Sequence, residues 1–190
     1  MSDVDDWVIA ARSGGGWALE RLWLEFAGPV AGYLRSRGVH SVDDVASEVF
    51  LAAFQRLPSF EGDGQAFRSW LFTIAHHRSV DDRRRETRER RTTVTRLNLD
   101  TAASVEDEAF AGVQIRAWLD SLPHSQRDVI WLRFVVDLSL EDVAKVTGQS
   151  VGAVKALQRR GIQRLQRHLN GATLREPASP ASLLTIAEQR

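Results

Sequence analysis

The sequence predicts an all-α fold made of two small helical domains joined by a flexible linker, the second domain containing a helix-turn-helix. Apolar residues recur at helical spacing in several segments, and no sustained alternation of apolar and polar residues indicates a strand. No Asn-Gly or Asp-Gly pair lies between two alternating runs, so hairpins are not expected. Residues 88–108 lack periodicity and divide the helical segments into two groups. We expect domains at residues 1–91 and 109–170, a linker at residues 92–108 and a disordered tail at residues 171–190.

The composition excludes several classes of protein. A hydrophobic fraction of 43% is normal for a globular chain. The sequence contains no cysteine, which excludes a disulfide scaffold, a thiolate metal site and a cysteine nucleophile. No apolar run approaches the ~18 residues of a membrane span, and the acidic start MSDVDD has the wrong charge for a signal peptide. We expect a cytoplasmic, soluble protein without membrane insertion, metal or cofactor.

The charges are balanced in number but unevenly distributed. The chain has 25 basic and 25 acidic side chains, a formal net charge of zero. Acids collect at the N-terminus, around residues 42–47 and at residues 100–108, whereas bases collect at residues 78–96 and 155–175. The two basic segments are separate patches that can each contact a polyanion.

Glycine and proline mark the boundaries of the first two helices. A helix from about Asp5 should stop at the triple glycine of residues 14–16. No strand precedes these glycines and no Gly-Lys-Ser/Thr follows them, so a hinge is favoured over a phosphate-binding loop. The next helix starts at Trp17, is expected to be interrupted at Gly28-Pro29, and resumes to Gly38.

A third helix, capped near Ser41 and ended by Pro58, has one apolar and one acidic side. The acidic side includes Asp44 and Glu48. These acids are either an ordinary solvated face or a docking surface for a basic partner.

A polar loop at residues 59–65 precedes a fourth helix that begins near Ala66, is rich in aromatic residues and runs into arginines. Such a combination can hold unstacked bases and their backbone. Taken alone, Phe67 and Trp70 are more typical of a hydrophobic core.

The second half predicts a helix ending near Leu122, Pro123 followed by a capping Ser125, and a helix-turn-helix over residues 138–169. In the latter, Ser139 is the expected cap of a short first helix, Gly148 suits the left-handed position that ends it, and Ser150 can cap the next helix.

The second helix of this motif has an apolar and a basic side. Val151, Val154, Ile162 and Leu165 share one side, with Leu157 at its edge. The other side has small residues in its first two turns and then arginines, and no acid occurs from residue 143 to residue 174. Small residues let a helix tip approach base edges and arginines reach phosphates, which favours DNA binding over a core helix with a merely solvated basic face.

Five stretches in order resemble the extracytoplasmic-function (ECF) sigma factors, the two-domain sigma subunits of bacterial RNA polymerase. Residues 44–51 (DVASEVFL) are similar to the family pattern Asp-Leu-x-Gln-Glu-x-Phe-Leu. Residues 67–75 (FRSWLFTIA) resemble Phe-Arg-x-Trp-Leu-x-x-Ile-Ala, and residues 80–85 (VDDRRR) resemble Ile-Asp-x-x-Arg-Arg. Residues 122–129 (LPHSQRDV) match the Leu-Pro entry of the second domain, and residues 151–160 (VGAVKALQRR) resemble its recognition helix.

The resemblance implies a role in transcription initiation for each domain. The first would bind the RNA polymerase core and melt the minus-ten element, and the second would bind the minus-thirty-five element. The core-binding residues would be Asp44, Ser47 and Glu48. The minus-ten residues would be Phe60, Glu61, Gly62, Asp63, Gly64, Gln65, Trp70, His77, Arg83 and Arg84. The minus-thirty-five residues would be Ser150, Gly152, Ala153, Lys155, Arg159 and Arg160. Implied partners are RNA polymerase core, duplex and melted promoter DNA, and an anti-sigma factor.

Three residues depart from the family pattern. Ser47 stands where glutamine is usual, His77 where asparagine is frequent, and Leu157 where many members have arginine. At Ser47 the departure implies either weaker core binding or tolerance of serine by the family. At His77 it leaves the base or backbone contact open, and at Leu157 it implies one phosphate contact fewer.

No enzyme is expected, because the chain offers no nucleophile and base at meaningful spacing. His76 and His77 lie ~100° apart on a helix, unlike a metal-binding i, i+4 pair. Two other functions stay open: a stand-alone helix-turn-helix regulator that binds DNA without polymerase, and a helical protein-interaction adaptor.

Overall fold

The computed structural model describes residues 3–92 and 119–173, and every regular element within these ranges is helical, which confirms the all-α prediction. The elements are α1 (Asp3–Arg12), α2 (Gly16–Ser36), α3 (Val42–Arg56), the 3-10 turn η1 (Leu57–Ser59), α4 (Gly64–Thr92), α6 (His124–Phe134), α7 (Leu140–Thr147) and α8 (Val151–Thr173). No helix in the described ranges is both long enough and apolar enough to cross a bilayer.

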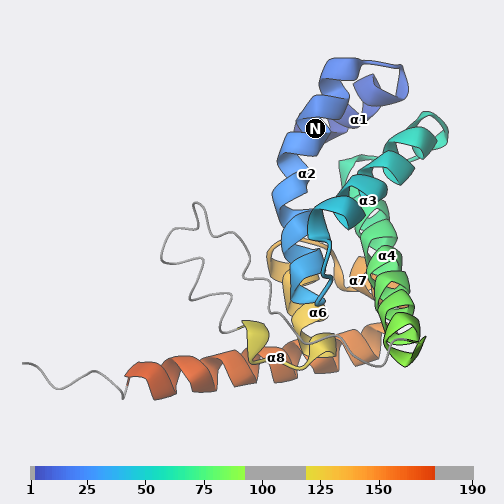
Figure 1. The fold of residues 1–190 in the computed structure, drawn as a ribbon. Coiled ribbons are helices and arrows are strands. Elements are labelled where there is room, and N and C mark those ends of the chain that lie inside the picture. The colour runs from blue at the N-terminus through green and yellow to red at the C-terminus, as the bar shows by residue number, and fades with distance from the viewer. Residues whose placement is uncertain (1–2, 93–118, 174–190) are drawn as a thin grey trace, which may run out of the picture.

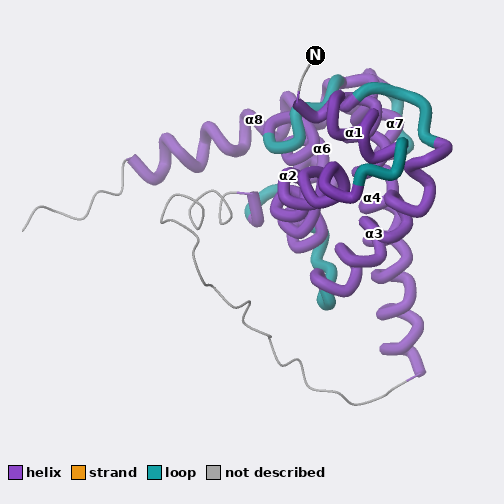
Figure 2. The backbone as a smooth tube through the Cα atoms, turned by 90° about the horizontal axis from the view of Figure 1, so that it is seen from above, coloured by secondary structure: helices purple, strands orange, loops and turns teal. Residues whose placement is uncertain are grey.

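The helices α1 to α4 form a first unit, and α6 to α8 form a second (Figure 1). In the first unit the long helices α2 and α4 run beside each other, α3 packs against both, and α1 lies at one end. In the second unit α8 crosses beneath α6, and the view from above shows its far end extending away from the other helices (Figure 2).

Large aromatic and aliphatic side chains fill the first unit. Tyr33, Phe50, Phe67 and Phe72 are each less than 2% exposed. Phe67 is therefore a core residue, as the simpler interpretation of its helix predicted, whereas Trp70 is half-buried. This core fixes α4, the helix that carries the predicted minus-ten residues from Gly64 to Arg84.

The predicted interruption of the second helix is wrong, because α2 is continuous from Gly16 to Ser36 with Pro29 inside it. Proline removes one backbone hydrogen bond from a helix. Phe26 and Val30, on either side of the ring, are both buried in the same core, and this packing holds the helix together across the missing bond.

Three other boundaries differ from the sequence prediction. The helix α4 continues to Thr92, into residues expected to lack structure, because an arginine-rich run has good helix propensity. Ser125 is not a cap: α6 begins at His124, and the extended backbone of Pro123 precedes it. Similarly, α8 continues to Thr173, past the predicted start of the tail. The rest of the predicted linker, most of the helix expected to end near Leu122 and the tail from residue 174 lie outside the described residues.

The two units are packed against each other. One hydrophobic cluster includes Leu22 and Phe72 of the first unit and Leu132 and Val143 of the second. Helix α6 contacts α2, and α7 contacts α4. The sequence predicted the two helical units but gave no sign of this shared core.

Candidate nucleic-acid interface

The corner between α7 and α8 is built by three local features, all of which the sequence predicted. The Ser139 hydroxyl accepts a 3.0 Å hydrogen bond from the backbone N–H of Asp142 and caps α7. Gly148 ends that helix in the left-handed conformation, with φ of 67°. Ser150 then accepts a 3.2 Å bond from the N–H of Ala153. Together these caps fix how α8 leaves the corner.

The buried side of α8 packs against α6 and α7. Val154 is fully buried and Leu157 is 9% exposed. At Gly161 an added Cβ would lie 2.9 Å from Ile130 Cγ1, so glycine permits the close crossing of α6 and α8. Leu157, which replaces a frequent arginine, therefore serves the core of this unit.

The residues predicted to read the minus-thirty-five element lie away from that core. Ser150, Gly152, Lys155, Arg159 and Arg160 are exposed, and Ala153 is half-buried. A Cβ at Gly152 would have no atom within 4 Å outside its own helix turn, so the tip of α8 is open among the described residues. Arg164 and Arg167 are exposed further along the helix and extend the basic side.

The predicted minus-ten loop is ordered by aromatic stacking. The rings of Phe60 and Trp70 are stacked, with centroids 4.9 Å apart and an interplanar angle of 23°. Phe67 contacts both rings edge-on from the core. Glu61, Gly62, Asp63 and Gln65 are exposed around this stack, whereas Gly64 is buried.

Two carboxylates hold the end of this loop. Asp63 accepts a 2.8 Å hydrogen bond from the N–H of Ala66, and Asp5 of α1 accepts one of 2.8 Å from the N–H of Gly64. An added Cβ at Gly64 would lie 2.8 Å from the Asp5 carboxylate oxygen and 2.9 Å from Val4, so glycine is required there. Sequence reasoning missed Asp5, because nothing local relates it to a loop 59 residues away.

Two adjacent histidines on α4 have different environments. His77, the predicted strand-contacting residue, is exposed. His76 is half-buried, and its Nδ1 lies 2.8 Å from the Tyr33 hydroxyl. Burial, together with the positive charges of Arg37 and His77, lowers the pKa of His76 to about 4. Only His77 is thus available on the surface.

The predicted arginines on α4 are also exposed, but one lies near the second unit. Arg84 forms a 3.7 Å ion pair with Asp81 on its own helix. The pKa of His124 at the start of α6 is lowered by burial and by the nearby charges of Arg83 and Arg127. Arg83 is therefore close enough to α6 to act on it electrostatically.

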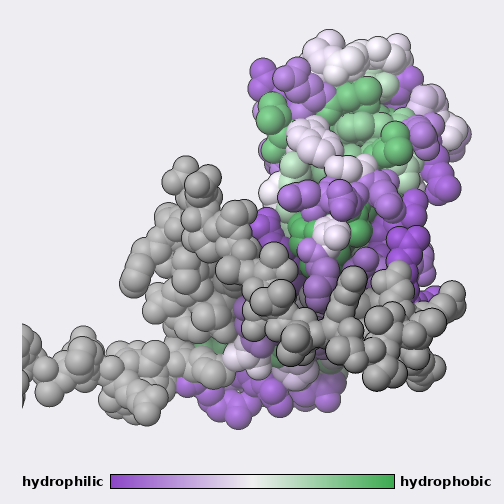
Figure 3. Space-filling model, viewed as in Figure 1, coloured by the Kyte–Doolittle hydropathy of each residue, from purple (hydrophilic) through white to green (hydrophobic). Residues whose placement is uncertain are grey.

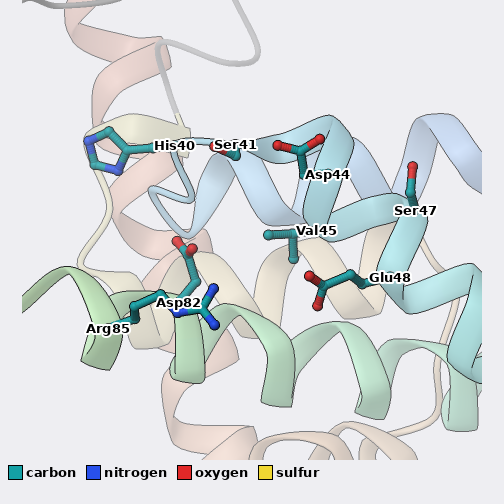
Figure 4. A pocket seen from close by; sticks show the side chains of 8 residues that line it. All are labelled: His40, Ser41, Asp44, Val45, Ser47, Glu48, Asp82 and Arg85. Atoms are coloured by element: carbon teal, nitrogen blue, oxygen red, sulfur yellow. The ribbon is translucent and has the colours of Figure 1, made fainter.

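The predicted core-binding residues line an open groove of about 700 Å³ between α3 and α4 (Figure 4). Asp44, Ser47 and Glu48 of α3 are exposed on its rim, opposite Asp82 and Arg85 of α4. Glu48 forms a 3.2 Å ion pair with Arg78, and Ser47 donates a 2.8 Å bond to the Asp43 carbonyl. Ser47 therefore bonds to its own helix, where a longer glutamine would reach outward.

An apolar surface that the sequence did not single out adjoins this groove. Apolar colouring gathers over α2 and α3 in Figure 3. The exposed apolar side chains on these helices include Trp23, Leu24 and Leu51. Leu51 lies one helical turn beyond Ser47, so the exposed face of α3 changes from acidic to apolar along its length.

Comparison with known families assigns both units to one class of protein. The family model Sigma-70 region 2 matches residues 23–89, and Sigma-70, region 4 matches residues 118–167. The fold and the two matches together define a sigma factor with these two regions. Helix α1, with Asp5, lies outside the matched ranges.

Three relatives show which family of sigma factors the chain is similar to. The chain is 37% identical over 131 residues to the ECF RNA polymerase sigma factor SigD of Mycobacterium tuberculosis, covering 66% of this chain and 62% of SigD. It is 34% identical over 170 residues to BldN of Streptomyces coelicolor, covering 85% and 64%. It is 32% identical over 136 residues to ShbA of Streptomyces griseus, covering 67% and 71%. The chain belongs to the ECF RNA polymerase sigma factor family, although it spans less than two thirds of the length of SigD and BldN.

Two solved structures have a similar fold. CnrH in complex with the cytosolic domain of CnrY is 28% identical, with a TM-score of 0.60, covering 89% of this chain and 99% of CnrH. RpoE of Bartonella quintana, solved with the anti-sigma factor NepR, shares the fold with a TM-score of 0.62 at 22% identity, covering 80% and 96%.

Proposed function

We propose that this protein directs RNA polymerase core to specific promoters, by binding the minus-thirty-five element and melting the minus-ten element. The observation that carries this proposal is the open, acid-free tip of α8 on a fold of the ECF sigma family. The protein would supply recognition and strand opening, and the polymerase would supply the chemistry. It would act in the cytoplasm, with residues 1–91 and 109–170 as its two working domains.

The minus-thirty-five contact would be made by Ser150, Gly152, Ala153, Lys155, Arg159 and Arg160. The small residues at the tip allow close approach to base edges in the major groove, and the arginines reach phosphates. Such contacts release counterions from DNA, so the affinity of the holoenzyme for its promoter should depend strongly on salt.

Melting would be driven by capture of unstacked bases at residues 60–65, with Trp70 and His77 lining the strand and Arg83 and Arg84 on its backbone. Flipping a base out of a duplex costs a few kcal/mol, and binding the flipped base offsets that cost. The Phe60–Trp70 stack supports this role because it leaves the loop ordered before DNA arrives.

The groove rim at Asp44, Ser47 and Glu48 would dock on a basic surface of the polymerase core. An exposed acidic helix face suits a positively charged partner through charge complementarity. Leu51 would extend this contact as an apolar anchor, because it follows the acids on the same exposed face.

An anti-sigma factor is a further proposed partner. RpoE of Bartonella quintana was solved with the anti-sigma factor NepR, and CnrH with the cytosolic domain of CnrY. These structures support a partner of the same kind for this chain.

Run-off transcription on genomic fragments with purified core polymerase tests the proposal directly. We expect promoter-specific product only when this protein is added. Product that does not depend on the protein, combined with tight operator binding by the protein alone, would favour a stand-alone regulator. Neither product nor DNA binding would favour a protein-interaction adaptor.

A further inference from the structure

One ion pair connects the proposed core-binding face of α3 with α4, the helix of the proposed strand contacts. Arg78 Nη1 lies 3.2 Å from Glu48 Oε2, and the two side chains are 44% and 53% exposed. Figure 4 shows Glu48 extending from α3 toward α4, whereas Asp44, one turn earlier, points away from α4. Glu48 is therefore already paired with an arginine of its own chain before any partner binds.

Residues on the outer side of α4 form two adjacent stripes. Trp70, His77 and Arg84 follow one another at seven-residue spacing, so they lie along one stripe, the proposed strand-binding side. Arg78 and Arg85 are also seven residues apart, about 100° further around the helix, and Arg85 lines the groove beside α3. Arg78 therefore lies on the border between the groove and the strand-binding side.

The chemistry of the Arg78 side chain suits both sides of this border. An arginine has a flexible apolar stem that carries its charged head along the protein surface. The planar guanidinium matches the geometry of a carboxylate and that of a phosphate through the same set of N–H donors. A change of rotamer, without movement of α4, can therefore turn Arg78 from Glu48 toward a phosphate beside His77.

The pair between Arg78 and Glu48 is weak enough to be exchanged. Both charges keep much of their contact with water, and an exposed ion pair of this kind changes an equilibrium constant by a factor of about five at most. A cationic surface of the polymerase core that binds Glu48 must displace Arg78, and this displacement costs little. The same surface repels the displaced guanidinium, whereas a DNA strand along the neighbouring stripe attracts it.

We propose that Arg78 exchanges partners during initiation: it pairs with Glu48 in the free protein and binds a phosphate of the melted minus-ten strand once the polymerase core has taken Glu48. Core binding thereby completes the strand-binding surface, and in the free protein this contact is masked. The inference rests on the proposed sigma function, because it needs both the core contact at Glu48 and the strand contact along α4.

Arg78→Gln tests the exchange, because the variant must change two affinities in opposite directions. Core polymerase no longer has to displace an arginine from Glu48, so affinity for core in the absence of DNA should rise about two- to fivefold. The holoenzyme should bind a single-stranded minus-ten oligonucleotide more weakly. The slope of log affinity against log salt should become shallower by about 0.7, the value for one phosphate contact on a single strand. A general loss of folding would lower both affinities.

Three further variants serve as controls. Arg78→Lys keeps the positive charge and should return both affinities toward those of the natural protein. Glu48→Gln with Arg78→Gln should bind core no more tightly than Glu48→Gln alone, because no carboxylate remains to be unmasked. Arg21→Gln, at an exposed position on α2 outside every proposed contact, makes the same change of charge and should leave both affinities close to those of the natural protein.

The natural protein decides the proposed function, and the variants decide the exchange. If the natural protein binds neither core polymerase nor, in its presence, the minus-ten strand, the proposed function fails and the exchange fails with it. If the natural protein binds both but Arg78→Gln does not bind core more tightly, Arg78 does not mask Glu48 and the exchange is wrong. An unchanged strand affinity and salt slope would overturn the phosphate contact. An equal gain in core affinity for Arg21→Gln would assign the gain to net charge and overturn the exchange.

Discussion

The carboxylate of Asp5 accepts a 2.8 Å hydrogen bond from the backbone N–H of Gly64, so helix α1 holds the end of the proposed minus-ten loop. Since α1 lies outside the matched Sigma-70 regions, this contact makes a segment beyond them part of the loop's support. The role of Asp5 would be to position residues 60–65 before a base arrives.

Asp5→Ala should therefore weaken binding of a single-stranded minus-ten oligonucleotide by the holoenzyme about five- to twentyfold, the effect of losing one charge-assisted hydrogen bond. Asp5→Asn keeps an acceptor oxygen and should recover most of the affinity. Asp6→Ala, at an exposed position on the same helix, is the control and should bind normally. An oligonucleotide with an abasic site at the flipped position should bind the natural protein and Asp5→Ala alike. If Asp5→Ala loses the same affinity for the intact strand and for the abasic strand, Asp5 supports only general folding.

The pH dependence of stability should reveal the buried Asp128. Burial raises the pKa of this carboxyl to about 6 from an ordinary 3.8, despite the opposing charges of Arg37 and Arg127. The folded state then binds the proton more tightly than the unfolded state does. The resulting stabilisation is complete below pH 3.8 and is lost as the pH rises through 6, on the order of 2–3 kcal/mol.

His76 has the opposite effect on the pH dependence of stability. Its pKa is lowered from 6.5 to about 4 in the folded protein, so the stability that it contributes is lost as the pH falls from 6.5 toward 4. The test is therefore a difference between proteins. The free energy of unfolding, measured in urea from pH 4 to 7, should change with pH by a different slope in the natural protein than in Asp128→Asn, since asparagine does not titrate. A carboxyl carbon resonance of Asp128 with a midpoint near 4 would contradict the burial argument.

Local signals in the sequence predicted local structure well. Ser139, Gly148 and Ser150 were recognisable because each acts on a backbone group within a few residues. The contacts Asp5–Gly64 and Arg37–Asp128 join residues that are 59 and 91 positions apart, so they leave no local pattern in the sequence. From the sequence alone, an isolated arginine or aspartate is expected to be a surface charge.

The errors have a related cause. At Pro29 a local rule predicted a break, but burial of the neighbouring side chains kept α2 continuous. The exposed faces of α3 and α8 were predictable from amphipathic spacing, whereas the packing of α6 on α2 required the tertiary structure.

Charge reversal on α8 should abolish minus-thirty-five recognition. We expect Arg159→Glu with Arg160→Glu to eliminate run-off product from a promoter that depends on this element, with helicity unchanged by circular dichroism. Both side chains are exposed, so the change costs the fold little. Replacing the pair with alanines should lower the salt dependence of promoter binding by about two units of slope if each arginine contacts one phosphate.

The matched control is Arg12→Glu with Arg21→Glu, two exposed arginines on α1 and α2 outside every proposed contact. This variant has the same net charge and should transcribe normally. A similar loss of run-off product in both double variants would show that overall charge is responsible and that a groove contact is not.

Binding to the polymerase core should depend on two chemically distinct parts of α3. Asp44→Lys with Glu48→Lys reverses the acidic rim of the groove and should weaken core binding about tenfold at low salt, with a smaller effect at high salt because exposed charges are screened. Leu51→Ser removes an exposed apolar side chain, and its effect should persist at high salt. Affinity measured by titrating labelled protein with core polymerase at two salt concentrations separates the two contributions. Glu20→Lys with Glu25→Lys, at exposed sites on α2, is the control for charge alone. If that control weakens binding as much as the α3 reversal does, core attraction is a property of net charge and the α3 face is not the docking surface.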